Sequence, residues 1–197
     1  MGASLLDLLL AYKPEEKTET EDLKRTIAFV QEYGDKCFDR NNLSGHITGS
    51  AWIENATGDK FLLTLHKKLG FWLQVGGHAD GNTDILAVAF KEAYEESGLK
   101  HLELAKEGIF DLSVHLFSIK SQHDHWHYDI RFLLKTTQPD DAIQLSDESL
   151  DLKWFTSLPP DLLPECTRMF RKWENYHKQN ISSYEVYSAK KILQNTT

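Results

Sequence analysis

Apolar residues recur along the chain with two different periods. Near the N-terminus the spacing is helical, which predicts a short helix over residues 3–11 and a second one from Glu21 to Tyr33, where Gly34 can end it. From about Gly45 onward the spacing alternates between that of strands and that of helices. We therefore expect helices first, as an appendage, and a mixed domain of strands and helices after them.

The part after Gly45 contains strand-like runs around one central helix. Strands are predicted at Ile47–Glu54, Phe61–His66, Phe71–Val75, Ile109–Ile119, Trp126–Lys135 and Leu150–Phe155. Helices are predicted at Ile85–Ser97, which Gly98 ends, and at Leu162–His177. This order of elements indicates an α/β sandwich with a mixed sheet.

Composition narrows the range of functions. The 197 residues are 41% hydrophobic and 26% charged, as in a globular protein, and the net charge is -8. Binding to nucleic-acid phosphates depends on Lys and Arg, so we expect no nucleic-acid partner. No apolar run reaches the roughly 18 residues of a membrane span, so we expect no membrane partner. The two cysteines, Cys37 and Cys166, form no CxxC pair, which favours a reducing, cytoplasmic compartment.

The central helix carries the most informative group of charges. Glu92, Glu95 and Glu96 fall within an arc of roughly 100° around the predicted helix, while Leu86 and Phe90 cluster on a different side. We therefore expect one side to pack on the sheet and the other to present three carboxylates. Like charges this close repel one another unless a cation binds them, and a hard divalent cation such as Mg²⁺ suits oxygen ligands.

A glycine pair precedes this helix. Gly76 and Gly77 allow the backbone to approach a ligand closely and to adopt positive φ. Thr83 or Asp84 can cap the N-terminus of the helix. A glycine-rich loop alone is a weak signal, but its fixed spacing to the glutamate cluster makes the combination specific.

The segment from Gly77 to Leu99, GHADGNTDILAVAFKEAYEESGL, closely resembles the Nudix box, G-x5-E-x7-R-E-U-x-E-E-x-G-U, in which U is a bulky aliphatic residue. The positions in register with the box are Gly77, Glu92, Glu95, Glu96, Gly98 and Leu99. Ala93 takes the first U position. Residues 46–99 also resemble a bacterial Nudix subtype with a GGHADG loop, so the resemblance covers the middle of the chain well and the ends poorly.

The resemblance implies a Nudix-type α/β/α sandwich with a mixed sheet, preceded by N-terminal helices. The corresponding division of the chain is a helical extension at 1–44, a Nudix hydrolase domain at 45–180 and a C-terminal tail at 181–197. The N-terminal helices are expected to cap the substrate cleft or to form the contact of a homodimer.

Two positions depart from the box. Thr83 stands where the box has its first glutamate, and Lys91 stands where it has arginine. In the family these two residues typically pair and brace the loop against the helix. Asp84, next to Thr83, is the residue that can pair with Lys91 instead. We expect altered bracing rather than lost catalysis.

The resemblance further implies roles for individual residues. Glu92, Glu95 and Glu96 are expected to bind Mg²⁺, or Mn²⁺ in its place, together with a backbone carbonyl at Gly76 or Gly77. One of these glutamates, or a carboxylate from a later loop, is expected to deprotonate the attacking water in an in-line displacement at phosphorus. The candidates from later in the chain are Glu148 first, Asp147 second and Asp129 third.

Four further residues are candidates for binding the substrate. Lys67 can hold a phosphate and Trp72 can stack on a base, although a lysine in solvent and a tryptophan in the core are the ordinary alternatives. His78 lies in the glycine loop, where it can contact the substrate or hold the loop. His127 is expected to contact phosphate or another part of the substrate.

Histidines also alternate before and into the strand predicted at Trp126–Lys135. On a strand, His123, His125 and His127 share one face. A transition-metal site is one interpretation of this pattern. The more common interpretation is a solvent-exposed strand end that is rich in histidine.

Three functions remain open. The first is Mg²⁺-dependent hydrolysis of the diphosphate linkage in a nucleoside diphosphate joined to another moiety. The second is a Nudix-fold module that binds a nucleotide or nucleotide sugar without turnover, although the three intact glutamates oppose it. The third is an isoprenoid diphosphate isomerase, which needs a reactive cysteine near the site, and Cys37 lacks the motif for that role.

Overall fold

The computed structural model describes residues 3–118, 124–139 and 142–194. Its helices are α1 (Leu5–Ala11), α2 (Lys17–Tyr33), the 3-10 helix η1 (Gly34–Phe38), α3 (Ile85–Ser97) and α4 (Pro164–Gln194). Its strands are β1 (Gly45–Glu54), β2 (Phe61–His66), β3 (Trp72–Leu73), β4 (Val75–His78), β5 (Leu102–Leu104), β6 (Asp111–Phe117), β7 (His125–Thr136) and β8 (Ser149–Phe155).

The strands form one mixed sheet with β1 at its centre. The main path runs β3-β2-β1-β7-β5, while β4 pairs with β1, β6 with β7 and β8 with β2. The pairing of β1 with β7 is parallel, and the other pairings are antiparallel. Every residue of β1 is buried, because both of its faces are covered. The mixed sheet that the sequence predicts is confirmed.

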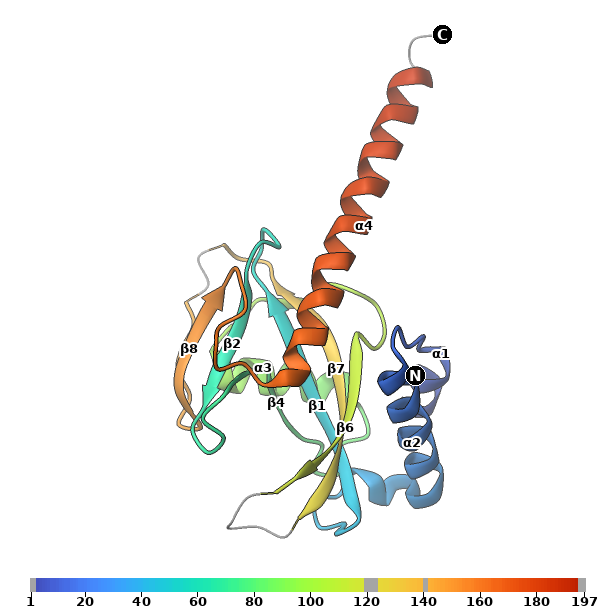
Figure 1. Cartoon of the computed structure of the whole chain (residues 1–197), viewed down its shortest axis with the longest axis vertical. Coiled ribbons are helices and arrows are strands. Elements are labelled where there is room, and N and C mark those ends of the chain that lie inside the picture. Colours follow the sequence, from blue (N-terminus) through green and yellow to red (C-terminus); the bar gives the residue numbers. More distant parts are fainter. Residues whose placement is uncertain (1–2, 119–123, 140–141, 195–197) are drawn as a thin grey trace.

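Helices cover both faces of this sheet (Figure 1). On one face, Val88 and Ala93 of α3 pack into a core with Ile53 of β1. On the other face, Met169 and Trp173 of α4 pack into a second core, which includes residues of β1, β2 and β7. Neighbouring residues of a strand point to opposite faces, so β1 contributes to both cores. The predicted α/β sandwich is therefore confirmed.

The N-terminal helices contribute to the first core, in which Leu5 and Leu9 of α1 and Phe29 of α2 are buried. The ring of Phe29 in α2 stacks on Tyr128 of β7 with centroids 4.0 Å apart. Glu19 of α2, fully buried, forms an ion pair with Lys172 of α4. Apolar and charged groups of α2 thus pack on the sheet and pair with α4.

Several other elements differ from the sequence expectations. The strand expected at Phe71–Val75 is divided into β3 and β4. Strand β4 continues to His78, so the glycine pair lies in a strand and the loop begins at Ala79. Strand β5 had no sequence signal, and it forms by pairing with β7. Helix α4 continues beyond His177 to Gln194 and extends away from the sheet (Figure 1).

Among the residues that the structure describes, no helix combines the length and the apolar character needed to cross a membrane.

Candidate functional site

Helix α3 has well-defined ends, which fix the positions of its glutamates. Asp84 caps the N-terminus, where its Oδ1 accepts a 3.0 Å hydrogen bond from the amide of Ala87. Gly98 ends the helix in the left-handed conformation, with φ of 71°, and its amide donates to the carbonyl of Tyr94 at 2.8 Å. Both predicted bounds of this helix are confirmed.

The glutamates lie closer to the core than the helical arc suggested. The residues of α3 that are buried include Ile85, Val88 and Ala89, and Glu96 is buried on the same side. Of the three carboxylates expected on the other side of the helix, only that of Glu95 is exposed, whereas Glu92 is half-buried and Glu96 is buried on the packed side. The arc of the three glutamates overlaps the packed face, and the last turns of the helix bring that face against β4.

Glu96 is held by the backbone of β4. Its Oε1 accepts a 2.8 Å hydrogen bond from the amide of Gly76, and the residue is only 8% exposed. Burial raises the pKa of the Glu96 carboxyl to about 8; the Gly76 hydrogen bond opposes this rise, and the charges of Glu92, Glu148 and Glu95 add to it. A buried carboxyl among like charges is a place where a cation would bind favourably.

Glu92 lies directly against Gly77. A Cβ atom at Gly77 would lie 2.5 Å from Cδ of Glu92, so only glycine leaves room for this carboxylate. A Cβ at Gly76 would lie 2.1 Å from Oγ of Ser50. Neither glycine has positive φ, which corrects the sequence expectation, because the requirement is close approach of side chains on both faces of β4. Burial raises the pKa of the Glu92 carboxyl as well, and Lys91 opposes that rise.

Lys91 pairs with the glutamates of its own helix. Its Nζ lies 2.7 Å from Oε2 of Glu95 and 3.0 Å from Oε1 of Glu92. Asp84, which the sequence suggested as a partner for Lys91, caps the helix instead. The positive charge of Lys91 therefore offsets part of the negative charge of the glutamate cluster.

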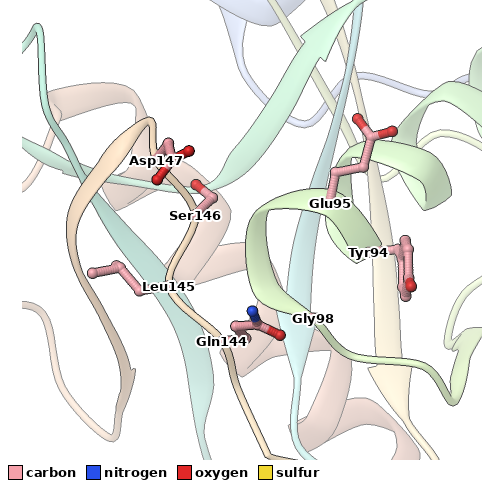
Figure 2. Close-up of a pocket in the computed structure, with 7 residues that line it drawn as sticks. All are labelled: Tyr94, Glu95, Gly98, Gln144, Leu145, Ser146 and Asp147. Atoms are coloured by element: carbon pink, nitrogen blue, oxygen red, sulfur yellow. The ribbon is translucent and has the colours of Figure 1, made fainter.

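Glu148 and Asp147 reach this helix through the segment before β8. The amide of Gln144 donates to the carbonyl of Ser97 at 2.7 Å, which packs the segment on the end of α3. Asp147 and Glu95 both line a cavity of about 350 Å³. Figure 2 shows that these two side chains come from different segments around it. The negative charge of Glu148 raises the pKa values of both Glu92 and Glu96, so it acts on the same cluster.

The two residues expected to bind phosphate and a base have different environments. Lys67 is exposed, and its amide donates to the carbonyl of Glu148 at 3.0 Å, beside the cluster. Trp72 is half-buried, and its ring packs edge-on against Phe155 with centroids 4.8 Å apart. The tryptophan therefore contributes to the core, as tryptophans ordinarily do.

Asp129, the third candidate base, is occupied by structural hydrogen bonds. Its Oδ1 accepts from the hydroxyls of Thr48 at 2.8 Å and Ser50 at 2.7 Å, and its Oδ2 accepts from Nε of Arg131 at 2.7 Å. The residue is 2% exposed. With these donors in place, Asp129 anchors β1 to β7 rather than facing a substrate.

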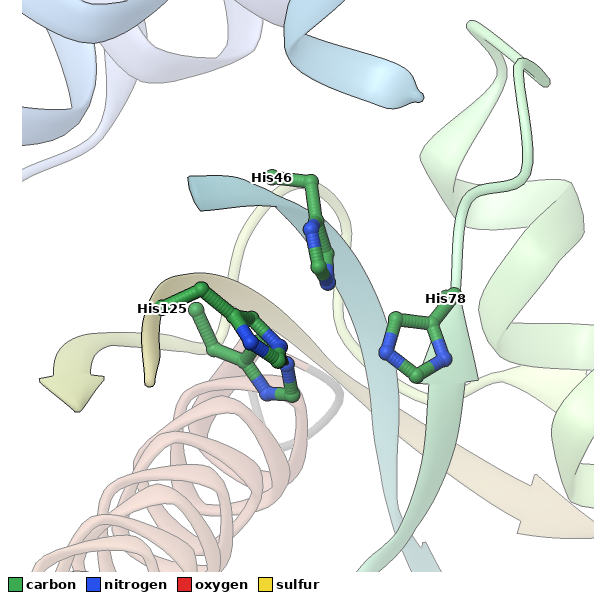
Figure 3. Close-up of side chains that lie close together, drawn as sticks. His46, His78 and His125 are labelled. Carbon is green, nitrogen blue, oxygen red and sulfur yellow. Dashed lines mark hydrogen bonds between the residues drawn. The ribbon is translucent and has the colours of Figure 1, made fainter. Parts of the chain in front are cut away.

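A second cluster lies on the other face of β4. His46 of β1, His78 of β4, and His125 and His127 of β7 bring one ring nitrogen each within 4.8 Å of one another. Figure 3 shows the rings of His46, His78 and His125 directed toward a common point. His125 and His127 share a strand face as predicted, whereas His123 lies outside the described residues. Burial places the pKa of His46 at about 4 and lowers that of His78.

Arg40 is a site neighbour that the sequence did not indicate. It forms a two-point ion pair with Asp80 in the loop after β4, where Asp80 has a φ of 50°. The hydrogen bond to Asp80 raises the pKa of Arg40, and the charges of Glu92 and Glu148 add to this effect. Arg40 lies in the segment after η1, and nothing in its sequence context linked it to the glutamates.

Both cysteines are fully buried, and burial raises the pKa of each thiol to about 12. Neither Cys37 nor Cys166 has the thiolate character that an isomerase would require.

The chain was compared with known proteins. No protein-family model matches it, and no curated protein matches it either. Solved structures do resemble it. An Ap4A hydrolase from C. elegans, in a binary complex, is 20% identical, with a TM-score of 0.52 over 68% of this chain and 98% of that one. A MutT protein from Methanosarcina mazei is 18% identical, with a TM-score of 0.50 over 70% of this chain and 98% of that one.

A Nudix-family hydrolase from Clostridium perfringens is 24% identical, with a TM-score of 0.49 over 66% of this chain and 97% of that one. At these identities the likeness establishes the fold alone, and the two structures with TM-scores of 0.52 and 0.50 support the α/β sandwich with a mixed sheet that the sequence predicts.

Proposed function

We propose that the chain is a Mg²⁺-dependent hydrolase that cleaves the diphosphate linkage of a nucleoside diphosphate derivative, with Mn²⁺ as a possible substitute. The observation that carries this proposal is the meeting of Glu92 and Glu96 with the glycine pair of β4. Glu96 accepts from Gly76, Glu92 fills the space beside Gly77, and the charge of Glu148 acts on both.

The donor set fits a hard divalent cation. Glu92, Glu95 and Glu96, with backbone of Gly76, offer oxygen atoms, which Mg²⁺ and Mn²⁺ prefer over nitrogen or sulfur. The pKa of Glu96 is raised because burial and neighbouring carboxylates disfavour its charged form. A neighbouring positive charge would stabilise that charged form. When bound, such a cation neutralises charge on the diphosphate and lowers the pKa of a bound water.

Side chains of this protein would then orient the attacking water and accept its proton. We assign the general base to Glu148, with Glu95 and Glu96 as alternatives, because Glu148 is placed on a separate segment that can face the water. Lys67 is exposed beside Glu148, where its ammonium group is suited to binding a phosphate of the substrate. The cavity between Asp147 and Glu95 is a place for the group attached to the diphosphate.

The substrate is proposed only as a class. The Ap4A hydrolase and the MutT protein share the fold, and the box chemistry is common to dinucleoside polyphosphates, nucleoside triphosphates, ADP-ribose and nucleotide sugars. Trp72 packs on Phe155, so we do not assign it a stacking role. His127 is 8% exposed and is one of the four clustered histidines, which leaves little surface for a substrate.

A panel of these four substrate classes, with Mg²⁺, Mn²⁺ or neither, tests the proposal. The expected result is metal-dependent release of phosphate, pyrophosphate or a mononucleotide from one class, and its loss in Glu96→Gln. Release that is independent of metal, or that persists in Glu96→Gln, would contradict the assignment of the glutamates.

One observation favours a second candidate, a nucleotide-binding module without turnover. Lys91 pairs with both Glu92 and Glu95, and so already supplies positive charge to the cluster. Under this alternative a nucleotide raises the thermal midpoint without metal, and no substrate of the panel is hydrolysed. If the unaltered chain hydrolyses no substrate, Lys91→Arg restores the residue of the box. Turnover gained by this variant would identify Lys91 as the cause of the missing activity.

A further inference from the structure

Three neighbouring strands bring four histidines together on the face of the sheet opposite α3. His46 of β1 is in register with His127 of the parallel strand β7. His125 lies two residues before His127, on the same strand face. On the other side of β1, His78 of β4 is in register with Thr48, whose side chain shares a face with that of His46. His46 therefore meets His78, 32 positions later, and His127, 81 positions later, only because of the strand order.

The four rings lie close enough together for each to offer one nitrogen to a shared metal ion. One nitrogen from each ring lies within 4.8 Å of those of the other three, and Nε2 of His125 lies 3.0 Å from Nε2 of His127. Four nitrogens around a tetrahedral zinc ion, each at about 2.0–2.1 Å, are separated by roughly 3.4 Å. Small rotations of the rings would bring the cluster to that spacing.

His46 supplies an independent reason to expect a ligand. It is 1% exposed, and neither of its ring nitrogens makes a hydrogen bond of ordinary geometry within the described residues. The backbone of Asn42 lies near enough to favour the protonated ring. That arrangement would leave the second nitrogen directed at the other histidines. A buried polar atom without a partner is costly, and a metal bond would satisfy it.

We propose that His46, His78, His125 and His127 form a binding site for a divalent transition metal of the zinc class. Imidazole nitrogen suits Zn²⁺, Cu²⁺, Ni²⁺ and Co²⁺, whereas Mg²⁺ prefers oxygen, so this site differs in chemistry from the glutamate cluster. His78 and His125 are half-buried, which gives a metal ion a path from solvent. Arg40 opposes a cation here, but its ion pair with Asp80 offsets that charge.

The histidine site does not depend on the proposed hydrolase activity. Gly77 faces Glu92, and the next residue, His78, points to the other side of the strand, where the histidines meet. The two candidate centres therefore use separate ligands, and each can be removed without replacing a ligand of the other.

The test uses the full chain, treated with a chelator and then titrated with Zn²⁺ by calorimetry and with Co²⁺ by visible absorption. We expect about one equivalent of Zn²⁺ per chain, and the intense visible bands of Co²⁺ in a tetrahedral nitrogen environment. His78→Ala and His125→Ala, at half-buried positions, should each weaken Zn²⁺ binding by about 10-fold or more. His101→Ala, an exposed histidine outside the cluster, should leave the affinity unchanged.

A variant with Glu92→Gln, Glu95→Gln and Glu96→Gln together separates the two centres, and it should keep both Zn²⁺ binding and the Co²⁺ spectrum. Loss of Zn²⁺ in this variant, or unchanged binding in the folded histidine variants, would assign the ion to another place. The Co²⁺ spectrum of the unaltered chain decides the matter even if a histidine variant fails to fold. Absence of those bands at saturating Co²⁺ would overturn the proposal.

Discussion

The amide nitrogen of Gly76 lies 2.8 Å from Oε1 of Glu96, and this hydrogen bond joins β4 to the last turn of α3. It fixes one oxygen of a buried carboxyl and leaves the other oxygen for a further ligand. The donor is a backbone group of a strand that is paired with β1, so its position is fixed by the sheet. The proposed metal site is thus held in place before any cation binds.

Glu96→Gln should lower turnover by about 100-fold or more under saturating Mg²⁺, since it removes the charge of a proposed ligand. Mg²⁺ should raise the thermal midpoint of the unaltered protein and raise that of Glu96→Gln much less. Steady-state kinetics and thermal unfolding measure the two effects. Glu107→Gln, at an exposed glutamate outside the site, should change neither.

Replacing Glu148 and Asp147 separately should distinguish the base from the cavity wall. Glu148→Gln is expected to lower kcat by about 10²-fold or more with little change in KM, because it removes the proposed proton acceptor. Asp147→Asn alters the lining of the cavity and should act mainly on KM. If Asp147→Asn lowers kcat and Glu148→Gln does not, the two roles are exchanged.

The sequence predicted those elements whose signals are local. Strand β2 and helix α3 have the predicted bounds, because alternation, the Asp84 cap and Gly98 all lie within them. Strand β4 escaped prediction since Gly76 and Gly77 have low strand propensity, and the strand exists through pairing with β1. The three residues of β5 likewise depend on β7.

The candidate site likewise has features that local spacing predicts and features that only the fold decides. Spacing placed Glu92, Glu95 and Glu96 on one arc, but it did not show that Ile85 and Ala89 turn that arc toward the sheet. His125 and His127 gave a visible alternation, whereas His46 and His78 are joined to them only by the strand order. A single sequence carries no signal of which distant strands become neighbours.

Alanine at the two glycines of β4 should have different effects. Gly77→Ala displaces the carboxylate of Glu92, a side chain that can rotate away, so we expect a folded protein with metal affinity lowered by about 10-fold or more. Gly76→Ala meets Ser50, including its Cα at 2.8 Å, so we expect a loss of about 1–3 kcal/mol in the free energy of unfolding.

Denaturant titrations and Mg²⁺ titrations, run on both glycine variants, separate these outcomes. Equal loss of stability in the two variants would contradict the different neighbours assigned to Gly76 and Gly77.

Asp111→Asn should remove the centre of a buried ion network. Arg131 lies 2.9 Å from this carboxylate, Arg168 lies 2.8 Å from it and Lys172 lies 3.1 Å from it. Burial alone would raise the pKa of Asp111, but the Arg168 hydrogen bond and the neighbouring cations hold it well below the usual value. Leaving three cations without their shared partner should cost about 3–5 kcal/mol at pH 7.

The pH dependence of this cost has a definite sign. A carboxyl whose pKa is lowered in the folded state stabilises the protein above the unfolded pKa of about 3.9, and that contribution is lost as the pH falls toward the folded pKa. The difference in unfolding free energy between the unaltered protein and Asp111→Asn should therefore be constant above about pH 5 and shrink below about pH 4. Asp161→Asn, at an exposed position, should stay within about 0.5 kcal/mol throughout.

The parallel pairing of β1 with β7 sets the order in which the chain can fold. Thr48 and Asp129, joined across this pair, are separated by 81 positions, and β1 has no exposed residue. During synthesis β1 can pair with β2 and β4 early, but its other edge stays unpaired until β7 leaves the ribosome. Chains that end before Thr136 should be captured by chaperones or aggregate, whereas a chain that includes β7 can close the sheet around β1.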